Sequence, residues 1–498
     1  MSENNKLKEG LNAITLTAIF EASALNRDEK LGGNIPSIKK LTRFGNKTFG
    51  YLSRVAMRHY LFETLSTLYK DDWEPAQCIE SGSGENKVVQ FDLTSQNIIT
   101  HAELDAFGYM FTIGGQSSIT RKAPVGITKA IALETWEGDM QFNANHDLAK
   151  RCGANPNPVN KEEQMSYFKV SFTIDIEKLG YDEWWIKDFS YDGNSKNLTL
   201  FLSEKGMEIE LTGVEQGDGE SNYKIGGKEE GNEISFNGLI CTVSKELMDE
   251  KTEKLKNQEE KKYISFKSDF IKSKEDNIRK EDSDQKSETK KVSGKKKTFK
   301  IYEYEIDDNS YQFTVGKYSY DTNAKTLTLS MVLSHTIKAE QATQTQQTQS
   351  HTFKIKKNGT ELGQIEIKEE GQKKKAIFKL SPDEKNKRLC QILTVLYNGL
   401  CYHVSGENYG IVPKFIIAAA LKLPIPIFNS FVELSKFENL ILQNEYIIKV
   451  NESKTMVYIH NPENLIEHID TTNLFTDWNE FLKTAGIECE DGTTSSQS

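Results

Sequence analysis

The residues most able to do chemistry are six cations in a stretch without acids. No aspartate or glutamate occurs between Lys30 and Phe62. That stretch contains Lys39, Lys40, Arg43, Lys47, Arg54 and Arg58. Because the whole chain has a formal net charge of -10, a block of one sign needs a physical reason. Fixed cations that face phosphates release condensed counterions, so a polyanion is the simplest partner for this block.

The last two cations are expected on a helix. Ser53 is a suitable N-cap, and apolar residues follow it at helical spacing: Ala56, Tyr60, Leu61, Leu65 and Leu68. Arg54 and Arg58 are four residues apart, so they share a helix face and can address successive phosphates. A charged, solvated helix face explains these two arginines equally well. For Lys39 and Lys40, the residues alone favour a solvated loop.

Sequence signatures of enzymes and metal sites are missing. The chain has no P-loop, no G-x-G-x-x-G after a strand and no G-x-S-x-G, and its eight histidines do not gather with a nucleophile and an acid. Cys390, Cys401 and His403 are close together, but the gap between the cysteines does not fit common zinc spacing, so buried thiols on a helix are the better explanation. We therefore predict no catalytic residues, no metal and no cofactor.

Composition indicates a cytoplasmic protein. The 498 residues allow two to four domains and a large core, and 27% of them are charged. No apolar run approaches the roughly 20 residues that span a bilayer, and the N-terminus lacks a signal-peptide pattern, so no membrane is expected as a partner. The six cysteines are scattered without a C-x-x-C pair, which predicts reduced thiols and no disulfide framework.

Hydrophobic periodicity predicts an α+β sheet around the basic block. Residues 13–22 alternate as a strand that turns Ile14, Leu16, Ala18 and Phe20 to one face. Further strands are predicted at 105–113, 125–133, 167–176 and 425–434, and a helix at 388–400. The order strand, helix, strands, helix, strand suits a ferredoxin-like or RRM-type fold.

A long insertion interrupts this pattern. From about residue 181 to 383 the chain is rich in lysine and glutamate with many short alternating runs, which predicts a large β-rich insertion. Its interior, about 245–300, is almost continuously charged and is expected to be disordered or a solvated helix. Residues 341–349 form a Gln/Thr-rich linker, and an acidic tail follows Glu488.

Several motifs, taken in order, resemble a known family. They are the segments 25–28 (LNRD), 54–58 (RVAMR), 105–110 (DAFGYM), 121–125 (RKAPV), 387–388 (KR) and 412–417 (VPKFII). Together they resemble the repeating backbone subunit of Cascade, the CRISPR surveillance complex, and in particular its type I-B, DevR-like group. The resemblance covers about residues 11–180 and 384–440, and the insertion matches nothing in it.

The resemblance implies a protein shaped like a right hand, with an RRM-type palm, fingers and a thumb hairpin. It places the palm at 1–70, 105–133, 167–180 and 384–440, the fingers excursion at 71–104 and the thumb at 134–166. The β-rich insertion then occupies 181–383, and a C-terminal extension with its acidic tail occupies 441–498.

The implied function is a non-catalytic guide subunit. Copies would polymerise along guide CRISPR RNA as a helical filament, together with other Cascade subunits, and present the guide for pairing with a target DNA strand. Such a subunit must hold any spacer, so it should grip sugar and phosphate and leave base edges free. The predicted RNA contacts are Asn26, Arg27, Lys39, Lys40, Arg43, Ser53, Arg54, Arg58, Arg121 and Lys122. The thumb aromatics Trp136 and Phe142 could stack on bases, although core packing explains Trp136 equally well.

Two alternatives remain open. Related subunits of type III complexes cleave target RNA with a loop aspartate and a divalent metal, and Asp28 lies in a comparable loop. An aspartate that caps the loop backbone and orients Arg27 is the structural alternative. A regulatory or interaction protein without nucleic acid is the other possibility.

Overall fold

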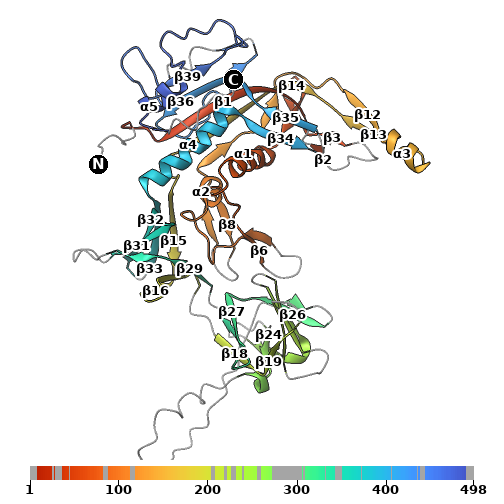
Figure 1. Ribbon diagram of the computed structural model, residues 1–498, viewed down its shortest axis with the longest axis vertical. Helices are drawn as coiled ribbons and strands as arrows, with labels where there is room; N and C mark the ends of the chain where they lie inside the picture. The colour runs from red at the N-terminus through yellow and green to blue at the C-terminus, as the bar shows by residue number, and fades with distance from the viewer. Residues whose placement is uncertain are drawn as a thin grey trace, which may run out of the picture.

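The computed structural model is a mixed, strand-rich α+β protein with several sheets (Figure 1). It describes residues 8–24, 27–28, 36–43, 45–81, 88–112, 118–203, 208–217, 221–225, 232–237, 240–254, 260–271, 305–306, 309–330, 333–342, 350–371, 373–404, 407–434, 436–437 and 444–489. A central sheet with its helices lies at one end, a middle lobe follows, and a distal module lies at the other end (Figure 1).

The central sheet has the strand order β39-β36-β1-β14-β11-β5-β4, and β10 also pairs with β14. Its strands are β1 (Ala13–Ser23), β4 (Lys40–Arg43), β5 (Lys47–Leu52), β10 (Val125–Ile127), β11 (Ala130–Ala132), β14 (Met165–Asp175), β36 (Pro413–Leu421) and β39 (Val457–His460). The strands β1 and β14 are antiparallel along their whole length, with Ala13 opposite Asp175. The strands predicted at 13–22 and 167–176 are therefore confirmed.

Two helices cover one face of this sheet. They are α1 (Arg54–Leu68) and α4 (Pro382–Asn398), and they contact one another. The predicted face of β1 lies in the core beneath them, where alternating apolar side chains remove the most surface from water. Ser53 caps α1 as predicted, because its Oγ accepts a hydrogen bond from the Ala56 N–H at 3.2 Å. Leu68 departs from the prediction, since it is 62% exposed.

Residues near the C-terminus cover the opposite face. Phe428 and Val432 are fully buried there against Ile417 and Val457. The strand predicted at 425–434 is therefore wrong: Pro424 and Pro426 lack N–H donors, and mostly turns form before β37 (Val432–Glu433) and β38 (Lys436–Phe437). The central sheet continues beyond residue 440, where the resemblance ends the palm, because β39 pairs with β36 and α5 (Trp478–Thr484) packs on β39.

A hairpin projects from the edge of the central sheet (Figure 1). It consists of β12 (Met140–Ala144), α3 (His146–Cys152) and β13 (Pro158–Glu162), within the segment predicted as a thumb. We call these three elements the projecting hairpin. Most of its side chains are exposed, as expected for an excursion with little core of its own. Beside its base lie the short strands β2 (Arg27–Asp28) and β3 (Ser37–Ile38).

The middle lobe combines the predicted fingers with both ends of the insertion around one core. It contains β6 (Cys78–Ser81), β7 (Val88–Phe91), α2 (Ala102–Phe107), β8 (Tyr109–Phe111), β9 (Ile119–Arg121), β15 (Tyr181–Ile186), β16 (Asp188–Asp192), β17 (Asn197–Phe201), β29 (Ser334–Lys338), β30 (Glu340–Gln341), β31 (Ser350–Lys357), β32 (Thr360–Glu370) and β33 (Lys373–Leu380). The strand predicted at 105–113 is thus only partly right. Gly108, at φ 67°, ends a helix before β8 begins, and a Cβ there would lie 2.4 Å from the Arg121 carbonyl oxygen.

The distal module has its own core and occupies the interior of the insertion. Its strands are β18 (Glu208–Thr212), β19 (Val214–Gln216), β20 (Asn222–Ile225), β21 (Glu233–Asn237), β22 (Ile240–Ser244), β23 (Met248–Lys254), β24 (Glu260–Phe266), β25 (Glu305–Ile306), β26 (Ser310–Thr314), β27 (Lys317–Asp321) and β28 (Thr326–Ser330). The predicted β-rich character is confirmed. In place of the disorder or solvated helix predicted from 245, the described residues 245–254 and 260–271 contain β23 and β24, because Leu247, Ile264 and Phe266 lie in the core. Residues 272–300, the linker 343–349 and the tail after 489 lie outside the described residues.

One disulfide contradicts the predicted reduced thiols. Cys390 on α4 bonds to Cys489, which follows α5. The sequence hides this pair, because its members are 99 residues apart and meet only when the C-terminal residues return to α4. Cys401 is also not a buried helical thiol; it is exposed on β34 (Leu400–Val404), which pairs with β35 (Glu407–Ile411). Among the described residues, none of the helices combines the length and apolar character that crossing a bilayer requires.

Candidate nucleic-acid interface

The acid-free block forms one edge of the central sheet. The strands β4 and β5 make a hairpin in which Arg43 pairs with Lys47, and β5 leads through Ser53 directly into α1. At about 3.3 Å of rise per residue, the six residues of β5 separate the hairpin tip from the helix by roughly 20 Å. The block is therefore an extended strip that continues from a strand into a helix.

Four cations of this strip are exposed, and we call Arg43, Lys47, Arg54 and Lys129 the basic strip. Lys129 precedes β11, and its Nζ lies 4.7 Å from the centroid of the Tyr51 ring on β5. Arg43 lies 5.8 Å from the centroid of the Phe49 ring. Within the part of the chain that the structure describes, none of the four forms an ion pair, so their charges are available to a polyanion.

Lys40, which is predicted to contact RNA, forms an ion pair within the protein. Its Nζ lies 2.6 and 2.7 Å from the two carboxylate oxygens of Glu162 on β13, and 3.9 Å from the centroid of the Trp136 ring. Partial burial alone would raise the pKa of Glu162. Hydrogen bonds from Lys40, from the Ser37 hydroxyl and from the Ile38 N–H outweigh that effect and lower the pKa. Lys40 thus links the β4 edge to the projecting hairpin.

Arg54 and Arg58 lie on the same face of α1, but their surroundings differ. Arg54 is exposed, whereas Arg58 donates to the Glu103 carboxylate at 2.9 Å and lies 4.7 Å from the centroid of the Phe107 ring. Glu103 also accepts a hydrogen bond from the Ala76 N–H. Arg58 therefore takes part in the contact between α1 and α2, and its role in RNA binding stays a prediction.

Arg121, which is also predicted to contact RNA, is buried. Its side chain is 4% exposed and lies 2.6 Å from the Asp105 carboxylate. Its remaining donors reach the backbone carbonyls of Asp105, Lys178 and Tyr181. Each of the three guanidinium nitrogens of this buried side chain therefore donates to a partner within the protein. Its neighbour Lys122, which directly follows β9, is exposed.

The two aromatic residues that are predicted to stack on bases, Trp136 and Phe142, differ in exposure. Trp136 is half-buried: its backbone N–H donates to the Thr48 carbonyl, and its ring packs on Lys40, so it belongs to the base of the projecting hairpin. Phe142 on β12 is 62% exposed, which leaves it open for stacking.

The remaining predicted residues lie beside β4. Asn26 and Glu29 are outside the described residues, while Arg27 and Asp28 pair through the backbone with Ile38 and Ser37 in β2 and β3. The half-buried Lys39 accepts a hydrogen bond from the Tyr51 N–H through its carbonyl, and the Ser53 hydroxyl is used in the cap of α1.

Comparison with known proteins now identifies the family. A family model described as CRISPR-associated negative auto-regulator DevR/Csa2 matches residues 14–441. The chain belongs to this family. A search of curated proteins finds no match.

Solved structures with similarity to this DevR/Csa2 family member come from CRISPR complexes. One is titled "CRISPR RNA-guided surveillance complex, pre-nicking" (10% identity, TM-score 0.25, covering 34% of this chain and 66% of that chain). Another is titled "CRISPR RNA-guided surveillance complex" (11%, TM-score 0.21, 34% and 51%). A third is titled "Type IV-B CRISPR Complex" (11%, TM-score 0.20, 32% and 71%). This chain thus spans about two thirds and about half of the first two, and TM-scores at this level carry no argument about its fold.

Sequence reasoning missed two residues of this site in the DevR/Csa2 chain. Glu162 lies more than 100 residues from its partner Lys40, and no local spacing joins them. Lys129 is a single cation before a short strand, and only the pairing of β11 with β5 brings it to the strip. Neither position carries a signal in the linear sequence.

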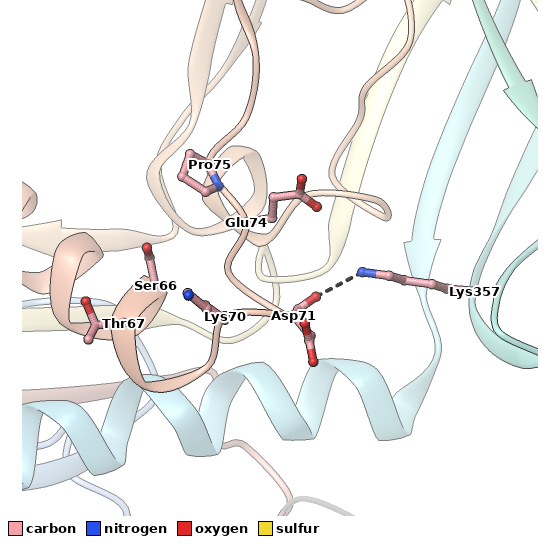
Figure 2. Close-up of a pocket in the computed structure, with 7 residues that line it drawn as sticks. All are labelled: Ser66, Thr67, Lys70, Asp71, Glu74, Pro75 and Lys357. Carbon is pink, nitrogen blue, oxygen red and sulfur yellow. Dashed lines mark hydrogen bonds between the residues drawn. The ribbon is translucent and has the colours of Figure 1, made fainter.

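A separate hollow of about 570 Å³ lies between the end of α1 and β31. Figure 2 shows its mixed lining, with Lys70, Asp71 and Glu74 near Lys357, whose Nζ donates to the Asp71 carbonyl at 2.9 Å. Because cations and acids are interspersed there, this hollow lacks the one-signed character of the basic strip. Among the described residues, no group of three or more His, Cys, Asp or Glu side chains could hold a metal.

Proposed function

We propose that this protein is a non-catalytic subunit that binds guide CRISPR RNA in the cytoplasm. Copies polymerise along the spacer as a helical filament and form the backbone of a type I-B Cascade complex with its other subunits. The filament presents the guide for pairing with a target DNA strand. Membership in the DevR/Csa2 family supports the CRISPR context.

The observation that carries the proposal is the basic strip. Arg43 and Lys47 at the β4–β5 hairpin, Arg54 at the start of α1 and Lys129 before β11 are exposed in a chain of net charge -10, and they form no ion pair among the described residues. Cations distributed along a strand and a helix grip a sugar-phosphate chain without reading its bases. That is the property a guide subunit requires, because every spacer differs.

The topology of the central sheet supports an RRM-type palm. In chain order β1, α1, β10–β11, β14, α4 and β36 give the sequence strand, helix, strand, strand, helix, strand. Their spatial order β36-β1-β14-β11 places the first and third strands in the centre, with both helices on one face. The projecting hairpin serves as the thumb, and Phe142 is its stacking residue, worth about 1–3 kcal/mol per stacked base.

The description of the family as a negative auto-regulator favours a second candidate, a regulatory protein. A regulator that acts through protein contacts alone would be purified without nucleic acid. The guide-subunit proposal requires the opposite, so the two candidates differ in a property that is simple to measure.

The test is to purify the protein from its own cells, extract bound nucleic acid and determine its length. We expect short RNA of uniform length. Protein free of RNA, with no affinity for added RNA, would refute the proposal and favour the regulator. Periodic cleavage of complementary RNA that is lost in Asp28→Ala would instead show the metal-dependent nuclease.

A further inference from the structure

The base of the projecting hairpin holds a dense set of polar contacts centred on Glu162. Its carboxylate accepts from the Ser37 hydroxyl at 2.6 Å, from the Ile38 N–H at 3.0 Å and from Lys40 Nζ. Its own N–H donates to the Pro36 carbonyl at 3.2 Å. A single side chain of β13 therefore binds both β3 and β4.

Glu162 is enclosed enough for these contacts to matter. Its side chain is 13% exposed and that of Lys40 is 21% exposed, so solvent screens the pair less than it screens surface ion pairs. Trp136 covers Lys40 from the other side, with its ring centroid 3.9 Å from Nζ, which adds a cation–π contact. Hydrogen bonds to charged groups are stronger than neutral ones, so this cluster is the firmest attachment at the hairpin base.

The register of the hairpin connects this cluster to Phe142. Met140 pairs with Glu162, and Phe142 pairs with Asn160, two positions further along. Because side chains alternate across a strand, Phe142 points from the same face of the hairpin as Glu162. Contacts that hold the Glu162 face of the hairpin against β3 and β4 therefore also set the direction in which the Phe142 side chain leaves the backbone.

We propose that Glu162 is a positioning residue whose clasp on Lys40, Ser37 and Ile38 holds the projecting hairpin and aims Phe142 along the side that faces β4. Lys40 acts through this clasp and does not bind phosphate. The second part rests on the proposed RNA function, whereas the clasp itself does not.

The clasp is tested without RNA, by hydrogen exchange of the β12 and β13 amides. Glu162→Ala removes all three side-chain contacts, and Glu163→Gln is the matched control on the neighbouring residue. We expect exchange in Glu162→Ala to be faster on the order of 10-fold, because hydrogen bonds to a charged group are lost, and exchange in the control to be unchanged. Unchanged exchange in Glu162→Ala overturns the inference. A melting scan shows whether the rest of the chain stays folded, and Glu162→Gln gives a milder variant if it does not.

A charge exchange separates the clasp from direct RNA contact. Lys40→Glu and Glu162→Lys should each loosen the hairpin, and the double variant should restore part of the protection, since the pair is re-formed with reversed charge. Failure of the double variant to restore protection contradicts a pairwise clasp.

The aiming of Phe142 is tested with single-stranded RNA that contains 2-aminopurine, whose fluorescence reports stacking. We expect Phe142→Ala and Glu162→Ala both to lose the stacking signal while the salt dependence of binding stays constant. Stacking that survives in Glu162→Ala refutes the aiming role, and a reduced salt slope in Lys40→Met shows that Lys40 binds phosphate. If hydrogen exchange responds as expected but no variant and no wild type binds RNA, the clasp stands and the proposed function fails.

Discussion

Two sets of arginines in this protein look alike in sequence and differ completely in the fold. Arg43 and Arg54 lie exposed on the basic strip, while Arg121 and Arg388 are buried around Asp105. Asp105 is fully buried, and its carboxylate lies 2.6 Å from Arg121 and 3.1 Å from Arg388. The difference shows that the distribution of acids, more than the number of cations, decides which arginines can meet a polyanion.

The buried arginines, Arg121 and Arg388, join the middle lobe to the central sheet and its helix α4. Arg388 on α4 donates to the carbonyls of Ile98 and Ile99. Arg121 on β9 donates to the carbonyl of Lys178, between β14 and β15, and to that of Tyr181, where β15 begins. Burial raises the pKa of the nearby Asp182, although Arg121 opposes that rise. The guanidinium fork suits such a junction, because it supplies several donors in fixed directions.

Arg121→Met should give the largest effect, because it leaves Asp105 and Asp182 buried without their main partner. We expect a loss of about 3–5 kcal/mol in the free energy of unfolding, measured by denaturant titration. Lys122→Met is the exposed control and should change stability by less than about 0.5 kcal/mol. A small loss in the unfolding free energy of Arg121→Met, together with weaker RNA binding, would show that Arg121 contacts RNA and does not stabilise the fold.

The stability of the middle lobe is also expected to depend on pH, because His335 is buried there. Its ring is fully buried, with Nδ1 donating to the Leu93 carbonyl and Nε2 accepting from the Asn97 amide. Burial lowers its pKa from 6.5 to about 4. Between these two values the unfolded chain binds a proton that the folded chain excludes, so stability falls as pH falls.

His335→Gln should flatten this dependence. From pH 7 to pH 5 the wild type should lose about 2 kcal/mol more than the variant, measured as the difference between their unfolding free energies at each pH. Equal losses in the two proteins would show that His335 does not titrate in this window.

Arg58→Gln tests a case between the exposed and the buried arginines. Arg58 belongs to the acid-free block of the sequence, but it pairs with Glu103 on α2. The substitution leaves Glu103 without its ion-pair partner, so we expect a loss of about 1–3 kcal/mol in stability. Arg54→Gln is the matched control, one turn away on the same face, and should leave stability unchanged within about 0.5 kcal/mol. If both variants keep full stability, Arg58 is not tied to Glu103 in solution.

The sequence predicts the local features of this protein well. The alternation in β1, the cap at Ser53 and the helix around Arg388 all follow from patterns within a few residues. The acid-free block also located Arg43, Lys47 and Arg54, because the absence of local acids is itself a local property.

Contacts between distant residues could not be predicted in this way. Glu162, Glu103 and Asp105 form ion pairs with Lys40, Arg58 and Arg121, respectively. Each pair is brought together only by the tertiary fold. The Cys390–Cys489 disulfide and the burial of Ile427, Phe428 and Val432 against the sheet were missed for the same reason. Periodicity describes how a segment folds, and it does not say what the segment packs against.

The most direct test of the account is the salt dependence of RNA binding. The affinity of the wild type and of the double variant Arg43→Gln/Arg54→Gln should be measured over a range of salt concentrations, for two unrelated single-stranded RNAs. We predict that the slope of log affinity against log salt falls in magnitude by about 0.7 for each phosphate contact removed, equally for both RNAs. An unchanged slope, or a loss for only one of the two RNAs, would contradict a strip that grips the backbone of any guide.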